Sequence, residues 1–126
     1  MKLPNGNQAV VPMEKLTGYC LSPDNRVGQH KARVFASALG ITAAEAELLR
    51  DALLAAARDQ DAQEDKRDHH GQRYVVDFPL RGPSGGEATV RSAWIIGTGE
   101  EVPRLVSCYV YDTTKKEQVD ERTQDI

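Results

Sequence analysis

The chain has 126 residues and a formal net charge of −3, so it is long enough to form one domain with a buried core. Its hydrophobic and charged fractions, 40% and 28%, are those of an ordinary globular protein, and its acidic balance argues against tight, non-specific binding to nucleic acid. No apolar run approaches the ~18 residues that span a bilayer, and the first residues lack the apolar stretch of a secretory signal. We therefore expect a cytoplasmic protein without a membrane partner.

Three helices are predicted in the first half of the chain. The first covers residues 13–21, although Gly18 weakens it. The second covers residues 27–39 and ends at Gly40, which suits a left-handed cap. Thr42 and Glu45 have the spacing of a capping box, so a third helix is predicted directly after them.

The second half of the chain has the pattern of a small sheet. The charged run 61–68 interrupts the apolar pattern, so we expect a solvated helix end or a mobile loop there. Period-two alternation then predicts strands over residues 73–80, 88–96 and 104–111, and their short connections favour an antiparallel meander. The predicted fold is α+β: about three N-terminal helices pack on a small antiparallel sheet within one domain, residues 1–111, followed by a polar, disordered tail over residues 112–126.

The cysteines and the paired histidines do not form a metal-site pattern. Cys20 and Cys108 are far apart in sequence and sit among apolar neighbours, which predicts buried free thiols. His69 and His70 are adjacent, so they cannot share one face of a helix or strand, and no spaced ligand accompanies them. We predict neither a metal nor a cofactor.

The start of the second predicted helix concentrates groups that suit an anion. His30, Lys31 and Arg33 fall in its first turns, where unpaired N–H groups and the helix dipole favour negative charge. The imidazole of His30 suits proton transfer near neutral pH, and either Lys31 or Arg33 could hold and neutralise a phosphate. The alternative for His30 is a half-buried structural role, because a helix places it beside Val34.

A second group of candidates lies on the predicted strands. Arg91 stands in the middle of an apolar strand, so it needs either a carboxylate such as Asp77 or an anion bound in a cleft. Ser92, Trp94 and Tyr109 are candidates to line such a cleft, with the aromatic rings stacking on bases. The alternative is that these aromatic residues belong to the core.

Several segments resemble a bacterial domain family of unknown function. The resemblance covers residues 3–111 and rests chiefly on GQHKARVF at 28–35, RSAWII at 91–96, and residues 21–24 and 103–109. Members of that family occur as small proteins, often encoded beside a short β-rich companion, an arrangement similar to a toxin–antitoxin or effector–immunity pair. The order of helices before an antiparallel sheet also resembles the barnase–EndoU–colicin–RelE ribonucleases, which cleave RNA on the open face of the sheet without a metal.

The resemblance to these ribonucleases implies a toxin-like, metal-independent endoribonuclease with RNA as its substrate. Its catalytic groups would be His30, Lys31 and Arg91, converging on one phosphate in a solvent-filled hollow, and its substrate-binding groups would be Arg33, Ser92, Trp94 and Tyr109. The chain departs from the family pattern at Asn25, where a histidine is expected in the turn.

Two other functions are compatible with the same residues. In the first, the basic helix start docks a small companion protein, and the chain is a non-enzymatic antitoxin, immunity protein or adaptor. The second is a small domain that binds an anion or a nucleotide.

Overall fold

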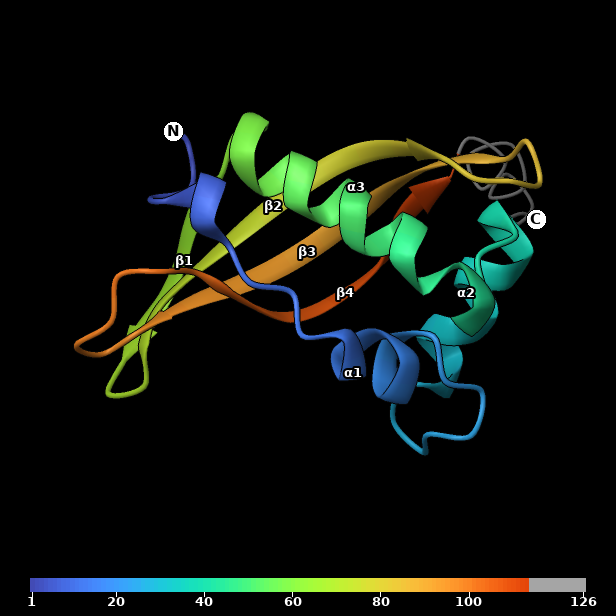
Figure 1. Ribbon diagram of the computed structural model, residues 1–126, viewed down its shortest axis with the longest axis horizontal. Coiled ribbons are helices and arrows are strands. Elements are labelled where there is room, and N and C mark those ends of the chain that lie inside the picture. The colour runs from blue at the N-terminus through green and yellow to red at the C-terminus, as the bar shows by residue number, and fades with distance from the viewer. Residues whose placement is uncertain (114–126) are drawn as a thin grey trace, which may run out of the picture.

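Two layers make up the structure, a computed structural model that describes residues 1–113 (Figure 1). The helical layer consists of η1 (Gly6–Gln8), α1 (Met13–Lys15), η2 (Leu16–Cys20), α2 (Gln29–Leu39), η3 (Ala43–Glu45) and α3 (Ala46–Asp59). The second layer is a sheet of β1 (Gln63–Asp68), β2 (Gly71–Arg81), β3 (Glu87–Gly97) and β4 (Arg104–Thr113). Residues 112 and 113 end β4, and the rest of the predicted tail lies outside the described residues.

The sheet is an antiparallel meander in the order β1-β2-β3-β4, which confirms the predicted fold class. β2 and β3 pair without interruption along their whole length, and Asp77 stands opposite Arg91. The pairing of β3 with β4 shifts twice, between Thr89 and Val90 and between Ala93 and Trp94. Such bulges increase the local twist of a strand.

The prediction of a loop or helix end over residues 61–68 was wrong, because most of this run forms strand β1, which pairs with β2. Every residue of β1 except Asp68 is exposed, so the strand has no buried face to produce an alternating pattern. Its backbone pairing does not depend on the side chains being apolar. Charged residues are common on edge strands, where they discourage pairing with another chain.

The local signals for the helices are confirmed, with one difference. Gly40 ends α2 with φ 73°, and the Thr42–Glu45 capping box precedes α3. The first predicted helix is instead a short α-helical turn, α1, that continues as the π-helical turn η2, with Gly18 inside it. π-turns widen the helix locally and are frequent at functional sites.

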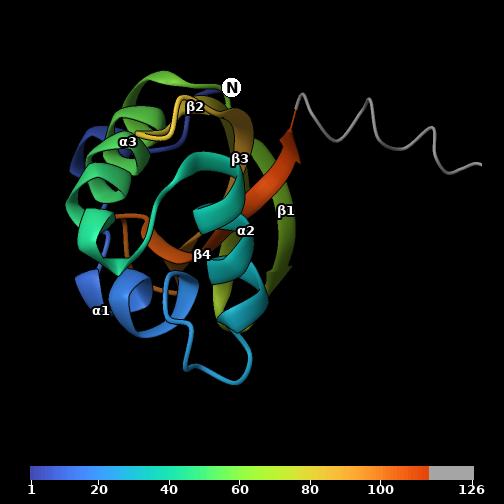
Figure 2. The same cartoon turned by 90° about the vertical axis from the view of Figure 1, so that its right-hand side faces the viewer.

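The helices cover only one face of the sheet. Val90, Ser92 and Trp94 of β3 face the helices and are fully buried. Their partners from α2 and α3 in the core are Phe35, Leu39, Leu49 and Leu53. α1 and α3 lie on one side of the strands, and α2 packs against β4 (Figure 2). Among residues 1–113, no element covers the opposite face, which carries Arg91.

Ser92 is the buried polar residue of this core. Its hydroxyl donates to the carbonyl of Val76 at 2.7 Å and accepts from Nε1 of Trp94 at 2.8 Å. The indole of Trp94 can therefore be completely buried without leaving its N–H unpaired.

We expect Ser92→Ala to lower the free energy of unfolding by about 1–3 kcal/mol, because the indole N–H and the Val76 carbonyl both lose a buried partner. Urea denaturation measures this change. The matched control is Ser37→Ala on the exposed side of α2, which should change stability by less than about 0.5 kcal/mol. Equal effects of the two substitutions would contradict the proposed role of Ser92 in the core.

Candidate functional site

The first turns of α2 lie beside β4, and the two elements border an open hollow of about 310 Å³. His30, Lys31 and Val34 line it from the helix, and Tyr109 and Val110 line it from the strand. The valines give it apolar walls, while the imidazole, the ammonium and the phenol supply polar groups. The structure therefore brings together three residues that the sequence predicted for the site, His30, Lys31 and Tyr109.

The ammonium of Lys31 is held by two tyrosines. Its Nζ donates to the hydroxyl of Tyr19 at 3.1 Å and lies 5.1 Å from the centroid of the same ring. It is also 6.0 Å from the centroid of the Tyr109 ring, at the outer limit of a cation–π contact. Sequence analysis missed Tyr19, since it lies in a weak helical pattern on a different element from Lys31 and no spacing connects the two.

The turn between η2 and α2 is fixed by the side chain of Asn25. Its Nδ2 donates to the carbonyl of Gly18 at 3.0 Å, and its Oδ1 accepts from the backbone N–H groups of Val27 and Gly28 at 2.9 and 2.7 Å. Asn25 therefore connects η2 to the start of α2. At the position where the family resemblance suggests a histidine, this chain has a residue that stabilises the turn.

Arg91 lies on the open face of the sheet in an ion pair with Asp77, one of the two alternatives that the sequence allowed. Its Nε and Nη2 donate to the two carboxylate oxygens, each at 2.8 Å. The side chains of Arg91 and Asp77 are 28% and 35% exposed, and the guanidinium carbon is 3.8 Å from the centroid of the Tyr111 ring. The hydrogen bonds to Asp77 raise the pKa of Arg91 further above its already high ordinary value, so the guanidinium stays charged.

The expected convergence of three groups on one phosphate is therefore only partly present. His30 and Lys31 share the hollow, whereas Arg91 does not line it and is bound to a carboxylate. Arg91 stands opposite Tyr109 in the β3–β4 pairing, so it lies next to the hollow without reaching into it.

Ser92 and Trp94 do not reach any ligand-accessible surface. Both are fully buried on the helical side of β3, opposite in direction to Arg91. Their assignment as substrate-binding residues is corrected to a role in the core, because alternate residues of a strand point to opposite faces.

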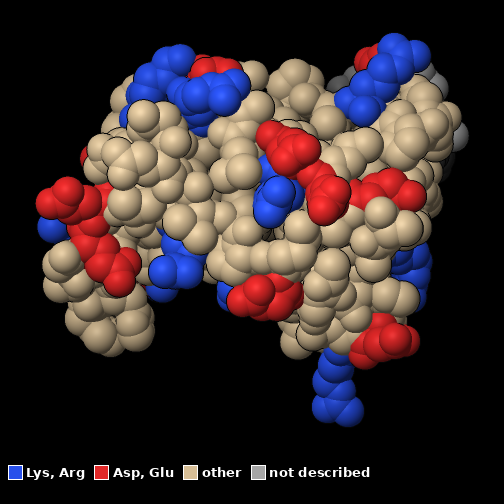
Figure 3. Space-filling model, viewed as in Figure 1, with Lys and Arg blue, Asp and Glu red and all other residues tan. Residues whose placement is uncertain are grey.

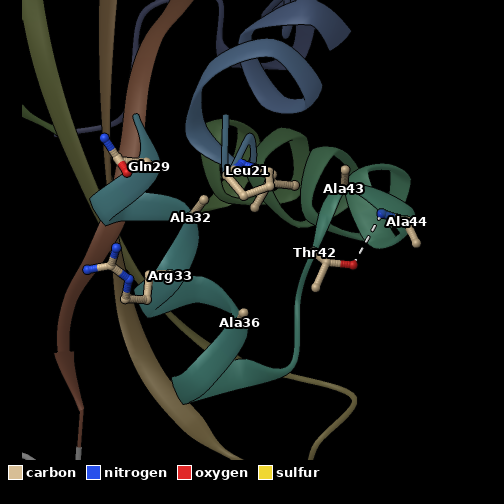
Figure 4. A pocket seen from close by; sticks show the side chains of 9 residues that line it. Leu21, Gln29, Ala32, Arg33, Ala36, Thr42, Ala43 and Ala44 are labelled. Carbon is tan, nitrogen blue, oxygen red and sulfur yellow. Dashed lines mark hydrogen bonds between the residues drawn. The ribbon is translucent and has the colours of Figure 1, made fainter. Parts of the chain in front are cut away.

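Arg33 is one of the residues that line a different groove of α2, and it does not line the hollow. This groove measures about 360 Å³ and runs between α2, the turn at Leu21 and Pro23, and the segment 42–44. Ala32 and Ala36 point across it toward η3, while the guanidinium of Arg33 projects to the other side of the helix (Figure 4). Arg33 therefore does not share the hollow of His30 and Lys31.

Cys20 and Cys108 are buried free thiols, in agreement with the sequence. The two thiols interact in the core. A hydrogen bond from the Cys108 thiol lowers the pKa of Cys20 to about 7. The same hydrogen bond and burial raise the pKa of Cys108 above its ordinary value. Each cysteine is next in sequence to one of the two tyrosines near Lys31: Cys20 follows Tyr19, and Cys108 precedes Tyr109. The contact between the thiols therefore joins the two elements that border Lys31.

The surface charge is mixed. Acidic and basic side chains are interspersed over the face that carries α3 (Figure 3). Within residues 1–113, no cluster of three His, Cys, Asp or Glu side chains is arranged to hold a metal ion. In the same part of the chain, no helix is long and apolar enough to cross a membrane.

Comparison with known proteins identifies a family and a shared fold. A family model described as a domain of unknown function (DUF6883) matches residues 2–112. A chain in the solved structure of a contact-dependent growth inhibition toxin–immunity protein complex from Klebsiella pneumoniae 342 is similar in fold, with a TM-score of 0.61 and 15% identity. The match covers 81% of this chain and 99% of that chain. No curated protein matches the chain.

We expect Gly28→Ala to lower the free energy of unfolding by about 1–3 kcal/mol, because a Cβ at this position would lie 2.1 Å from the carbonyl oxygen of Tyr19 and would force the backbone apart. Thermal denaturation of the purified chain measures the loss. Gly18→Ala is the matched control in the same region, since its Cβ would meet no atom within 4 Å. A loss in Gly18→Ala as large as in Gly28→Ala would show that the close approach to Tyr19 is not the cause.

Proposed function

The chain belongs to the family described as a domain of unknown function (DUF6883), and we propose that it is the toxin of a toxin–immunity pair and acts as a metal-independent endoribonuclease. The observation that carries the proposal is the hollow between α2 and β4, where the neighbours His30 and Lys31 meet Tyr109 from a distant part of the sequence. The likeness in fold to a chain of a toxin–immunity complex supports a role in such a pair.

Each group in the hollow has a distinct role in the proposed reaction. His30 takes the proton of the attacking 2′-hydroxyl or donates one to the leaving oxygen. Lys31 compensates the negative charge that develops on the phosphate, and the ring of Tyr109 offers a surface on which a base can stack. An RNA strand can reach these groups because the hollow is open and His30 is exposed.

The role of Arg91 differs from the one that the family resemblance implied. Because Asp77 binds two of its nitrogens, the pair adds little net charge to the site. Lys31 is then the cation within the hollow, and Arg91 orders the sheet face next to Tyr109 and Tyr111.

The second candidate is a non-enzymatic immunity protein, antitoxin or adaptor. Two observations favour it: Arg91 is already paired with a carboxylate, and Asn25 stabilises a turn at the position where a histidine is expected. In this alternative, the ammonium of Lys31 receives an acidic side chain of a small companion protein instead of a phosphate.

Expression of the chain without a partner distinguishes the two functions. As a toxin, it should slow growth, and the purified chain at micromolar concentration should cleave total RNA without added metal. We expect His30→Ala to reduce cleavage by about 10²- to 10⁴-fold, as for loss of a general acid or base. The control, His69→Ala, removes an exposed histidine in the β1–β2 turn and should have no effect.

A harmless chain that leaves RNA intact would reject the ribonuclease proposal. Formation of a stable complex with a companion protein, weakened by Lys31→Ala, would then support the docking function.

A further inference from the structure

A lysine side chain is usually mobile, and the one in the hollow is restrained. Four rotatable bonds separate an ammonium from its backbone, and fixing them costs up to about 2 kcal/mol of conformational entropy. The Nζ of Lys31 is nevertheless bound to the Tyr19 hydroxyl and faces the rings of both Tyr19 and Tyr109. A cation that is already fixed loses less freedom when an anion binds.

The backbone around Tyr19 is built to bring it close to the start of α2. Tyr19 lies in the π-turn η2, and its carbonyl approaches Gly28 so closely that only a residue without a Cβ fits there. The hydrogen bond from Asn25 to the carbonyl of Gly18 connects the same two segments. Three separate features therefore hold Tyr19 against the start of α2, the helix that borders the hollow.

Tyr19 does not itself line the hollow, so it contacts a ligand there only through Lys31. Its hydroxyl accepts a hydrogen bond from the ammonium, which leaves the other two donors of Nζ available. The Tyr19 hydroxyl is a neutral acceptor, so it does not offset the positive charge of Lys31. The carboxylate of Asp77, in contrast, offsets the charge of Arg91.

We infer that Tyr19 is a positioning residue that holds the ammonium of Lys31 toward the hollow, so that a phosphate group meets a pre-oriented cation. This inference rests on the proposed function, because it assigns phosphate as the group that the hollow receives. It adds to the site a residue on η2, an element that sequence analysis did not connect with the reaction.

Inorganic phosphate is the probe that tests this inference apart from catalysis. Titration of the wild-type chain, followed by NMR shifts of the His30 and Lys31 amides, should show saturable binding that Lys31→Ala abolishes. Tyr19→Phe keeps the ring and removes the hydroxyl, and we expect it to raise the dissociation constant about three- to tenfold. Tyr19→Leu, which also removes the ring, should raise it further.

The matched control is Tyr111→Phe, which removes the hydroxyl of an exposed tyrosine that stacks on Arg91 and not on Lys31. It should leave phosphate affinity unchanged. Thermal midpoints equal to that of the wild type would show that Tyr19→Phe is folded. If the chain cleaves RNA, Tyr19→Phe should lower kcat more than it raises KM, because the lysine acts mainly on charge formed in the transition state.

The outcomes separate this inference from the proposed function. Weakened phosphate binding in Tyr19→Phe, with RNA left intact by every variant, supports the positioning role and rejects the ribonuclease. Unchanged phosphate affinity in Tyr19→Phe, or no binding of phosphate to the wild type, overturns the positioning role even if RNA is cleaved.

Discussion

The close contact between the backbone of Tyr19 and Gly28 determines where the candidate site forms. It fixes the start of α2 against η2, and from this start the side chains of His30 and Lys31 reach the edge strand β4. Asn25 closes the turn between the two segments with three hydrogen bonds. The hollow is therefore a product of backbone packing as much as of the side chains that line it.

The one-sided sheet divides the polar groups of β3 between two roles. Ser92 faces the helices and satisfies the indole of Trp94 inside the core, whereas its neighbour Arg91 faces outward and binds Asp77. Successive residues of a strand point in opposite directions. The Ser92–Trp94 pair therefore stabilises the interior, and the Arg91–Asp77 pair orders the open face. Proximity in sequence thus says little about membership in a site.

Local signals were readable from the sequence, whereas contacts between distant elements were not. The cap at Gly40, the Thr42–Glu45 box and the alternation of β2 to β4 each depend on a few neighbouring residues, and all were predicted. β1 was missed because it has no buried face. The covered face of the sheet and the partner of Lys31 could not be chosen from the sequence, because periodicity identifies two faces without saying which one the helices cover.

The placement of the two thiols couples the interior of the protein to its surface chemistry. Cys20 and Cys108 each share a peptide bond with one of the tyrosines near Lys31, so the packing of the two thiols holds the backbone of η2 against that of β4. Because both cysteines are fully buried, a larger substituent at either sulfur would push these two backbone segments apart. A chemical change deep in the core would therefore reach the backbone on both sides of Lys31 and leave every exposed side chain chemically intact.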